Sequence, residues 1–89
     1  MLTREIIIIG KVQGVFFRSQ AKREAEKLGL TGFIENLNDG SVRITAEGST
    51  EALDEFQRWC HRGPPSAIVE RVEMQEIPPK GFSTFEIRR

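Results

Sequence analysis

Four consecutive isoleucines, Ile6–Ile9, lead directly into a loop that contains two glycines, Gly10 and Gly14. Isoleucine is β-branched and favours strands, and a continuous apolar run is typical of a strand in the interior of a sheet. We therefore predict an interior strand over residues 4–10, which the glycines end, followed by a loop and the start of a helix. A strand-to-helix loop of this kind collects unpaired backbone N–H groups, which favours the binding of an anion.

The rest of the chain alternates between helical and strand patterns. Apolar residues recur at helical spacing over residues 17–28, and again from Ser49, a predicted N-cap, to about residues 61–63. Strand patterns cover residues 31–37, 41–47 and 68–74, and a last short edge strand is predicted over residues 82–88. Because Asn38-Asp39-Gly40 is a hairpin turn signal, we expect the two strands that flank it to pair antiparallel.

The predicted order is strand, helix, strand, strand, helix, strand, with a terminal addition. This order predicts an α+β fold, the ferredoxin-like sandwich (βαββαβ), in which an antiparallel-dominated sheet carries two helices on one face. Right-handed crossovers place the first and third strands side by side in the middle of the sheet. At 89 residues, we expect residues 1–89 to form a single domain.

The composition of the chain indicates which kinds of binding partner and which cellular location to expect. Thirteen basic and thirteen acidic residues cancel, which argues against a nucleic-acid or membrane-surface binder, and the longest apolar run is only four residues. Cys60 is the only cysteine, so no internal disulfide forms, and it lies on an apolar helical stripe where a buried thiol is expected. The start of the chain shows no signal-peptide pattern, so we expect a cytoplasmic protein, and its small size and balanced charge suggest a monomer.

The glycine loop does not fit the common nucleotide motifs. The spacing of Gly10 and Gly14 matches neither G-x-G-x-x-G nor G-x-x-x-x-G-K-[ST], and on the glycines alone a structural connector is the commoner interpretation. Arg18 favours an anion site, because a cation at a helix start opposes the helix dipole unless an anion binds between them. A phosphate suits the site, because a guanidinium group binds phosphate with two parallel hydrogen bonds.

Asn36 is a second candidate functional residue, near the end of its strand and just before the hairpin turn. Its carboxamide both donates and accepts hydrogen bonds and could hold a water molecule, although Asn36 and Asn38 could equally serve only to reverse the chain. His61 stands alone, and the sequence shows neither a Ser-His-Asp set nor metal-ligand spacing, so no metal is expected. Any reaction here would therefore depend on positioning and electrostatics rather than on a protein nucleophile.

Two stretches carry a resemblance to a known family. Residues 8–18, IIGKVQGVFFR, look like the first signature of the acylphosphatases, and residues 32–42, GFIENLNDGSV, followed by Gly48, resemble the second. The likeness extends to the closing residues 85–89. This resemblance implies the ferredoxin-like fold and hydrolysis of the carboxyl–phosphate bond of small acyl phosphates, giving a carboxylate and inorganic phosphate. It also implies that no metal or organic cofactor takes part, and that inorganic phosphate binds as product or inhibitor.

The resemblance also implies roles for individual residues. Arg18 matches the phosphate-binding catalytic arginine, and Asn36 matches the catalytic asparagine that orients the attacking water. The backbone that cradles the phosphate corresponds to Gln13, Gly14, Val15, Phe16 and Phe17, together with Arg18. Two positions depart from the family pattern: Glu35 replaces a basic or neutral polar residue, and Ile34 is bulkier than the usual valine or alanine. Strand alternation predicts that Glu35 points away from Asn36.

Two non-enzymatic alternatives concern the same fold. An RNA-binding sheet is disfavoured, because residues 42–47 carry no aromatic side chain and the net charge is zero. A non-catalytic phosphate-binding or regulatory module remains open, since related domains occur inside larger proteins. Turnover of an aromatic acyl phosphate without added metal distinguishes the enzyme from such a module.

Overall fold

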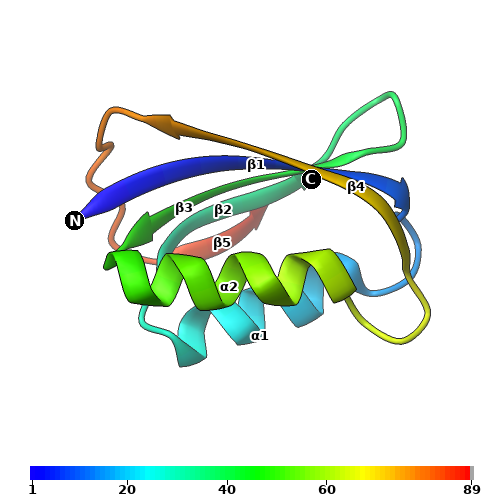
Figure 1. The fold of residues 1–89 in the computed structure, drawn as a ribbon, viewed down its shortest axis with the longest axis horizontal. Coiled ribbons are helices and arrows are strands. Elements are labelled where there is room, and N and C mark those ends of the chain that lie inside the picture. The colour runs from blue at the N-terminus through cyan, green and yellow to red at the C-terminus, as the bar shows by residue number, and fades with distance from the viewer. Residues whose placement is uncertain (89) are drawn as a thin grey trace.

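A computed structural model describes residues 1–88 of the chain. The strands form one sheet, and both helices cover the same face of it (Figure 1). The elements are β1 (Leu2–Lys11), α1 (Phe17–Lys27), β2 (Thr31–Asn36), β3 (Val42–Gly48), α2 (Thr50–Arg62), β4 (Ile68–Ile77) and β5 (Phe85–Arg88). The predicted α+β ferredoxin-like sandwich is confirmed.

The strand order across the sheet is β4-β1-β3-β2-β5. As predicted, β1 is an interior strand that lies beside β3, and β2 and β3 form an antiparallel hairpin. The pairing of β1 with β4 is antiparallel as well, whereas β5 runs parallel to β2, with Ile34 opposite Ile87. The sheet is therefore mixed, and its single parallel pair brings the C-terminal strand beside the strand that ends at Asn36.

The prediction that Gly10 ends the first strand is wrong. β1 continues through Gly10 to Lys11, with a bulge in its pairing to β4 between Ile9 and Gly10. Gly10 has φ = 142°, and a Cβ atom at this position would lie 2.1 Å from the carbonyl oxygen of Ile68. Only glycine allows this close approach of the two backbones, so Gly10 bends the strand toward the loop instead of terminating it.

Both C-terminal strands differ in length from the prediction. β4 extends to Ile77 rather than ending at Met74, and β5 begins at Phe85 rather than at Phe82. The Glu47 carboxylate accepts hydrogen bonds from the backbone amides of Lys80 (2.7 Å), Gly81 (3.0 Å) and Phe82 (3.3 Å). Because these amides bond to a side chain, that segment cannot join the ladder of the sheet.

The core lies between the sheet and the two helices. Alternate residues of β1 and β3 are fully buried there, among them Ile6, Ile8 and Ile44. The helices contribute the predicted stripes, which comprise Phe17, Ala21 and Ala25 from α1 and Leu53, Phe56 and Cys60 from α2. The Phe17 ring also packs edge-on against Trp59, with 5.4 Å between the ring centroids, so the start of α1 is fixed to α2.

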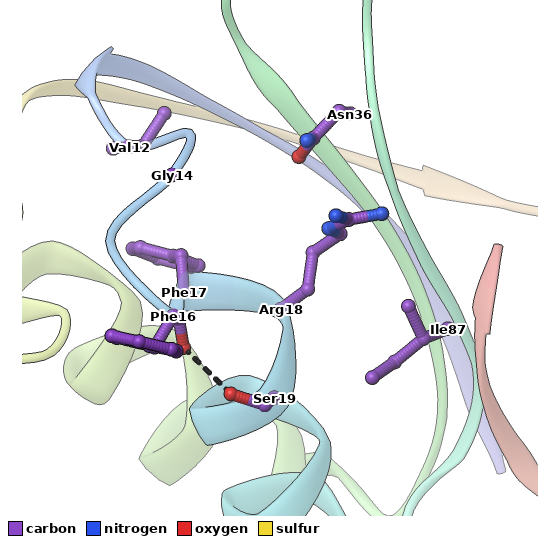
Figure 2. A pocket seen from close by; sticks show the side chains of 8 residues that line it. All are labelled: Val12, Gly14, Phe16, Phe17, Arg18, Ser19, Asn36 and Ile87. Carbon is purple, nitrogen blue, oxygen red and sulfur yellow. Dashed lines mark hydrogen bonds between the residues drawn. The ribbon is translucent and has the colours of Figure 1, made fainter. Parts of the chain in front are cut away.

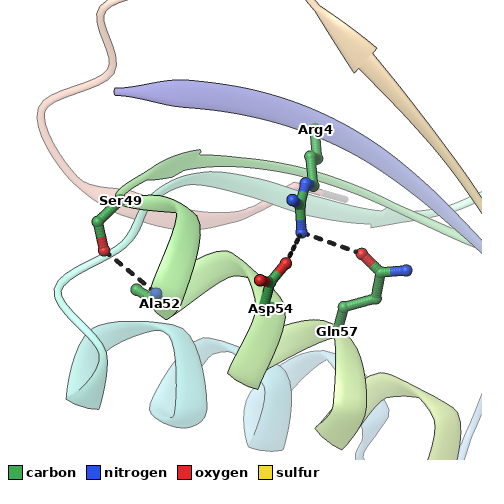
Figure 3. A network of polar contacts seen from close by, with 5 residues as sticks. All are labelled: Arg4, Ser49, Ala52, Asp54 and Gln57. Atoms are coloured by element: carbon green, nitrogen blue, oxygen red, sulfur yellow. Dashed lines mark hydrogen bonds and ion pairs between the residues drawn. The ribbon is translucent and has the colours of Figure 1, made fainter.

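Polar contacts hold α2 against the sheet (Figure 3). The predicted N-cap is confirmed, because Ser49 Oγ accepts a hydrogen bond from the amide of Ala52 at 3.1 Å. From β1, Arg4 Nη1 donates to Asp54 Oδ1 at 2.8 Å and to Gln57 Oε1 at 3.2 Å.

Neither helix of the described chain combines the length and the apolar character needed to span a bilayer.

Candidate active site

A pocket of about 340 Å³ opens where the loop after β1, the first turn of α1 and the end of β2 meet. Its lining includes Arg18 and Asn36, which arrive on different elements, and the Arg18 side chain extends toward Asn36 (Figure 2). The lining residues are Val12, Gly14, Phe16, Phe17, Arg18, Ser19, Asn36 and Ile87. The fold therefore joins the two sequence candidates in one cavity.

Four side chains fix the loop between β1 and α1. Val12 and Val15 are buried in the core, and Phe17 follows them into it at the first residue of the helix. Between the two valines, Gln13 Nε2 donates to the carbonyl oxygens of Leu37 (2.8 Å) and Ser41 (2.9 Å). With these three apolar anchors and one polar anchor, the loop has a defined shape before any ligand binds.

The first turn of α1 has no cap of its own. Its N-cap residue, Phe16, has a left-handed backbone (φ = 62°), provides no side-chain cap, and no acidic residue follows it in the first turn. Within residues 1–88, none of the amides of residues 13–19 donates a hydrogen bond to another residue. Free amides and the positive end of the helix dipole favour an anion at this point.

Arg18 adds a full positive charge beside these amides. Its half-buried side chain donates one hydrogen bond, from Nη1 to the carbonyl oxygen of Arg88 at 3.2 Å. Among residues 1–88 no other atom accepts a hydrogen bond from this guanidinium group, so within the described chain four of its five N–H groups are free to bind a ligand. The predicted conflict between a cation and the helix dipole is therefore present in the structure, and an anion in the pocket would relieve it.

Asn36 is the last residue of β2 and lies opposite Val42 of β3. Its Oδ1 atom is buried and has no hydrogen-bond partner among residues 1–88. A buried polar atom without a partner is costly unless a water molecule or a ligand satisfies it. The Asn36 side chain also lines the pocket, so a small molecule bound there would lie beside this carboxamide.

The two departures from the family pattern lie outside the pocket. Glu35 follows the buried Ile34 in β2 and, by strand alternation, lies on the opposite face of the sheet from Ile34 and Asn36, as the sequence predicts. Its carboxylate binds Arg43 on the neighbouring strand, with Nη2 at 2.6 Å and Nε at 2.9 Å. Ile34 is fully buried in the core. Glu35 therefore brings no negative charge to the lining of the pocket.

The sequence candidates fall into two groups. The pocket lining contains Gly14, Phe16, Phe17, Arg18 and Asn36. Gln13 and Val15 do not line it, because the Gln13 side chain binds the hairpin and the Val15 side chain lies in the core. A contribution of their backbone amides to phosphate binding remains a prediction.

The sequence did not predict three of the residues that line the pocket, namely Val12, Ser19 and Ile87. Val12 and Ser19 flank the predicted cradle, and their position beside the helix start is a signal that could have identified them. Ile87 had no comparable signal. It reaches the pocket only because β5 pairs in parallel with β2.

Other reactive side chains lie elsewhere. Cys60 is fully buried in α2, and this burial raises the pKa of its thiol, so the reactive thiolate does not form. His61 is exposed in the last turn of α2. Among residues 1–88 no group of three or more His, Cys, Asp or Glu side chains is arranged to hold a metal ion.

Known proteins resemble the chain over nearly its whole length. The sequence profile of the family described as acylphosphatase matches residues 4–87. An acylphosphatase from Alkalilimnicola ehrlichii is 52% identical over 83 residues, which cover 90% of this chain and 93% of that protein. The crystal structure of acylphosphatase from Bacillus subtilis superposes with a TM-score of 0.97 at 38% identity, covering all of both chains. An acylphosphatase from Coxiella burnetii gives a TM-score of 0.95, also at 38% identity, over 98% of this chain and 92% of that one.

Proposed function

The chain belongs to the acylphosphatase family and is an acyl phosphate hydrolase, and we propose that the pocket around Arg18 and Asn36 is its active site. One observation carries this proposal. Three features meet in one cavity: a guanidinium group, a helix N-terminus without a side-chain cap among residues 1–88, and a buried carboxamide oxygen with no hydrogen-bond partner among the same residues. The first two features suit a phosphoryl group, and the third suits the water that attacks it.

Binding of the substrate begins with its phosphoryl group. In our proposal the amides of residues 13–17 donate to the phosphoryl oxygens, while Arg18 binds two of them through parallel N–H groups. These donors are fixed before the substrate arrives, because Val12, Val15 and Phe17 anchor the loop in the core. A preorganised set of donors stabilises the charge on the equatorial oxygens in the transition state, which is the main requirement of phosphoryl transfer.

Cleavage requires a water molecule opposite the leaving carboxylate. We assign its orientation to Asn36, whose Oδ1 accepts one of its hydrogens. The water oxygen forms a bond to phosphorus as the bond between phosphorus and the carboxyl oxygen breaks, and the electron pair of that bond leaves with the carboxylate. Among residues 1–88 the lining of the pocket includes no carboxylate or imidazole, and in our proposal the proton of the water passes to a phosphoryl oxygen. A carboxylate is a weakly basic leaving group and needs no acid to assist it.

A pocket of about 340 Å³ is large enough for a small acyl phosphate, which we propose as the substrate. We further propose that inorganic phosphate is a product that also inhibits. We propose that residues 1–89 act as one domain without a metal or organic cofactor; Arg89 lies outside the described residues. A monomer with no nucleic-acid or membrane partner agrees with the equal numbers of basic and acidic residues. We also propose a cytoplasmic location for the protein.

Replacement of the guanidinium group tests the binding part of the proposal. Arg18→Ala should lower kcat/KM for benzoyl phosphate by about 10³ or more, because neutral amides alone would face the doubly charged phosphoryl group. Competitive inhibition by inorganic phosphate should weaken in parallel. Arg18→Lys keeps the charge but loses the paired donors, so its activity should lie between those of Arg18→Ala and the wild type. Equal activity of all three proteins would exclude a role for Arg18.

Replacement of the carboxamide tests the catalytic part. Asn36→Ala should lower kcat by about 10²–10³, the usual effect of losing one positioned group, with little change in the inhibition constant of inorganic phosphate. Asn38→Ala is the matched control, because it removes an exposed carboxamide from the adjacent turn and should keep wild-type turnover. Near-normal kcat in Asn36→Ala would remove the proposed role in orienting water.

A non-catalytic phosphate-binding module is the competing interpretation. It predicts binding of inorganic phosphate without hydrolysis of any acyl phosphate. Following benzoyl phosphate by absorbance in buffer that contains a chelator separates the two cases, since only the enzyme consumes the substrate. The full-length similarity to stand-alone acylphosphatases favours hydrolysis.

A further inference from the structure

The side chain of Gln13 connects the two halves of the proposed active site. It belongs to the loop after β1, but its Nε2 atom lies between two backbone carbonyls of the β2–β3 hairpin, at 2.8 Å from Leu37 O and 2.9 Å from Ser41 O. These distances are those of good N–H···O bonds, and together they use both hydrogens of the amide group. The orientation of the Gln13 carboxamide is therefore fully defined.

The two carbonyl oxygens that accept these hydrogen bonds belong to the residues next to the Asn36–Val42 pair, on the side of the turn. Leu37 directly follows Asn36 in the chain, and Ser41 directly precedes Val42, the residue paired with Asn36 across the hairpin. Gln13 thus binds both strands of the hairpin, at the residues next to the Asn36–Val42 pair. A displacement of the loop relative to this pair would stretch at least one of the two bonds.

The hairpin turn is rigid without Gln13. Within it, the amide of Leu37 donates to Ser41 O at 2.9 Å and the amide of Gly40 donates to Leu37 O at 3.2 Å. Asp39 Oδ1 also accepts a hydrogen bond from the backbone amide of Ser41 at 2.9 Å. Removal of Gln13 would therefore leave the turn closed and Asn36 on its strand, and would release only the link to the phosphate loop.

From this geometry we propose that Gln13 is a positioning residue, which sets the distance between the phosphate-binding amides and the water held by Asn36. The inference rests on the proposed function of the pocket. A shift of about 1 Å between reacting groups costs on the order of 10²-fold in rate, whereas phosphate binding by the loop itself tolerates the shift, because the amides and Arg18 move together. Loss of Gln13 should accordingly lower kcat and spare phosphate affinity.

The test compares two side chains, Gln13 and Ser66, whose hydrogen bonds hold the same loop. Gln13→Ala should lower kcat for benzoyl phosphate by about 10-fold or more and change the inhibition constant of phosphate by less than about 3-fold. Ser66→Ala is the matched control: it removes the bond from Ser66 Oγ to Val15 O (3.4 Å), which ties the loop to the segment after α2 and not to the hairpin. Its kcat should stay near that of the wild type. Circular dichroism at the assay temperature gives the folded fraction, to which kcat is normalised.

A titratable variant supplies a readout that general destabilisation would not give. In Gln13→Glu the ionised carboxyl group faces two carbonyl oxygens and donates nothing, so kcat should fall at least as far as in Gln13→Ala. As the pH is lowered and the introduced group protonates, one O–H donor returns, and kcat relative to the wild type at the same pH should recover in part. A constant ratio across the pH range would argue against the proposal.

A double variant separates this inference from the proposed function. If Gln13 acts through Asn36, Gln13→Ala should cause little further loss of kcat in an Asn36→Ala background. A full, additive loss would overturn the inference, as would a kcat of Gln13→Ala equal to that of the wild type or a parallel loss of phosphate affinity. Failure of the proposed function has a different signature, namely no hydrolysis by the wild type or normal turnover in Asn36→Ala alone.

Discussion

Phe16 is the single non-glycine residue among residues 1–88 with a positive φ, at 62°. It forms the N-cap of α1 and lines the pocket, yet 76% of it is exposed. An L-residue in this left-handed conformation has its Cβ too close to its own carbonyl group, and burial of the ring does not offset that cost here. The strain is located where the free amides of the loop turn into the helix, beside Arg18.

Substitution of Phe16 measures this strain. Phe16→Gly and Phe16→Ala both remove the exposed ring, but only glycine adopts φ = 62° without a Cβ clash. The glycine variant should be more stable than the alanine variant by about 1 kcal/mol, after allowing for the greater freedom of glycine in the unfolded chain. Urea unfolding of both variants gives the difference. An alanine variant at least as stable as the glycine variant would show that the loop relaxes and stores no strain.

At the scale of the elements, the sequence predicts those helices and strands that depend on residues close together in the chain. The isoleucine run predicts an interior strand, the spacing of Phe17, Ala21 and Ala25 predicts α1, and Ser49 marks the start of α2; all are observed. The glycine loop is also located correctly. The end of β1 is not, because the effect of Gly10 depends on the close approach of Ile68, which lies far away in the sequence.

Apart from Val12 and Ser19, which adjoin the predicted cradle in the chain, the parts of the candidate site that the sequence does not predict depend on long-range pairing. Ile87 enters the pocket through the parallel pairing of β5 with β2, and Arg18 donates to the carbonyl oxygen of Arg88 for the same reason. The sequence motif identifies Gln13 as a candidate. It does not predict that the Gln13 side chain binds the hairpin rather than the pocket. Periodicity and turn signals describe neighbours along the chain, so contacts of this kind are beyond their reach.

At the scale of the whole molecule, Glu47 connects the far end of the sheet to the C-terminal strand. Its carboxylate is only 1% exposed and accepts hydrogen bonds from the Thr3 hydroxyl and from the amides of Lys80, Gly81 and Phe82. These amides belong to the segment between β4 and β5, and β5 then carries Ile87 to the pocket. One buried carboxylate thus fixes the path by which the C-terminal strand returns to the candidate site.

These hydrogen bonds lower the pKa of Glu47 below its ordinary value of 4.5, with the Thr3 hydroxyl as the largest cause and the amide of Lys80 next. The unfolded chain therefore takes up the proton at a higher pH than the folded chain does. The contribution of Glu47 to the free energy of unfolding is complete above pH 4.5 and is lost as the pH falls from there through the lowered pKa. Acid should thus weaken the attachment of the C-terminal segment.

Glu47→Gln should remove this contribution at every pH. At pH 7 the variant should lose about 1.5–3 kcal/mol in free energy of unfolding, the usual value for hydrogen bonds to a charged group. Its stability should also fall less steeply than that of the wild type below pH 4.5, although Asp39, whose pKa the Ser41 hydroxyl and amide also lower, keeps part of the dependence. Urea unfolding at a series of pH values measures both effects. The exposed Glu55→Gln is the matched control and should follow the wild-type curve; identical slopes for Glu47→Gln and the wild type would show that the buried carboxylate does not govern the acid sensitivity of the fold.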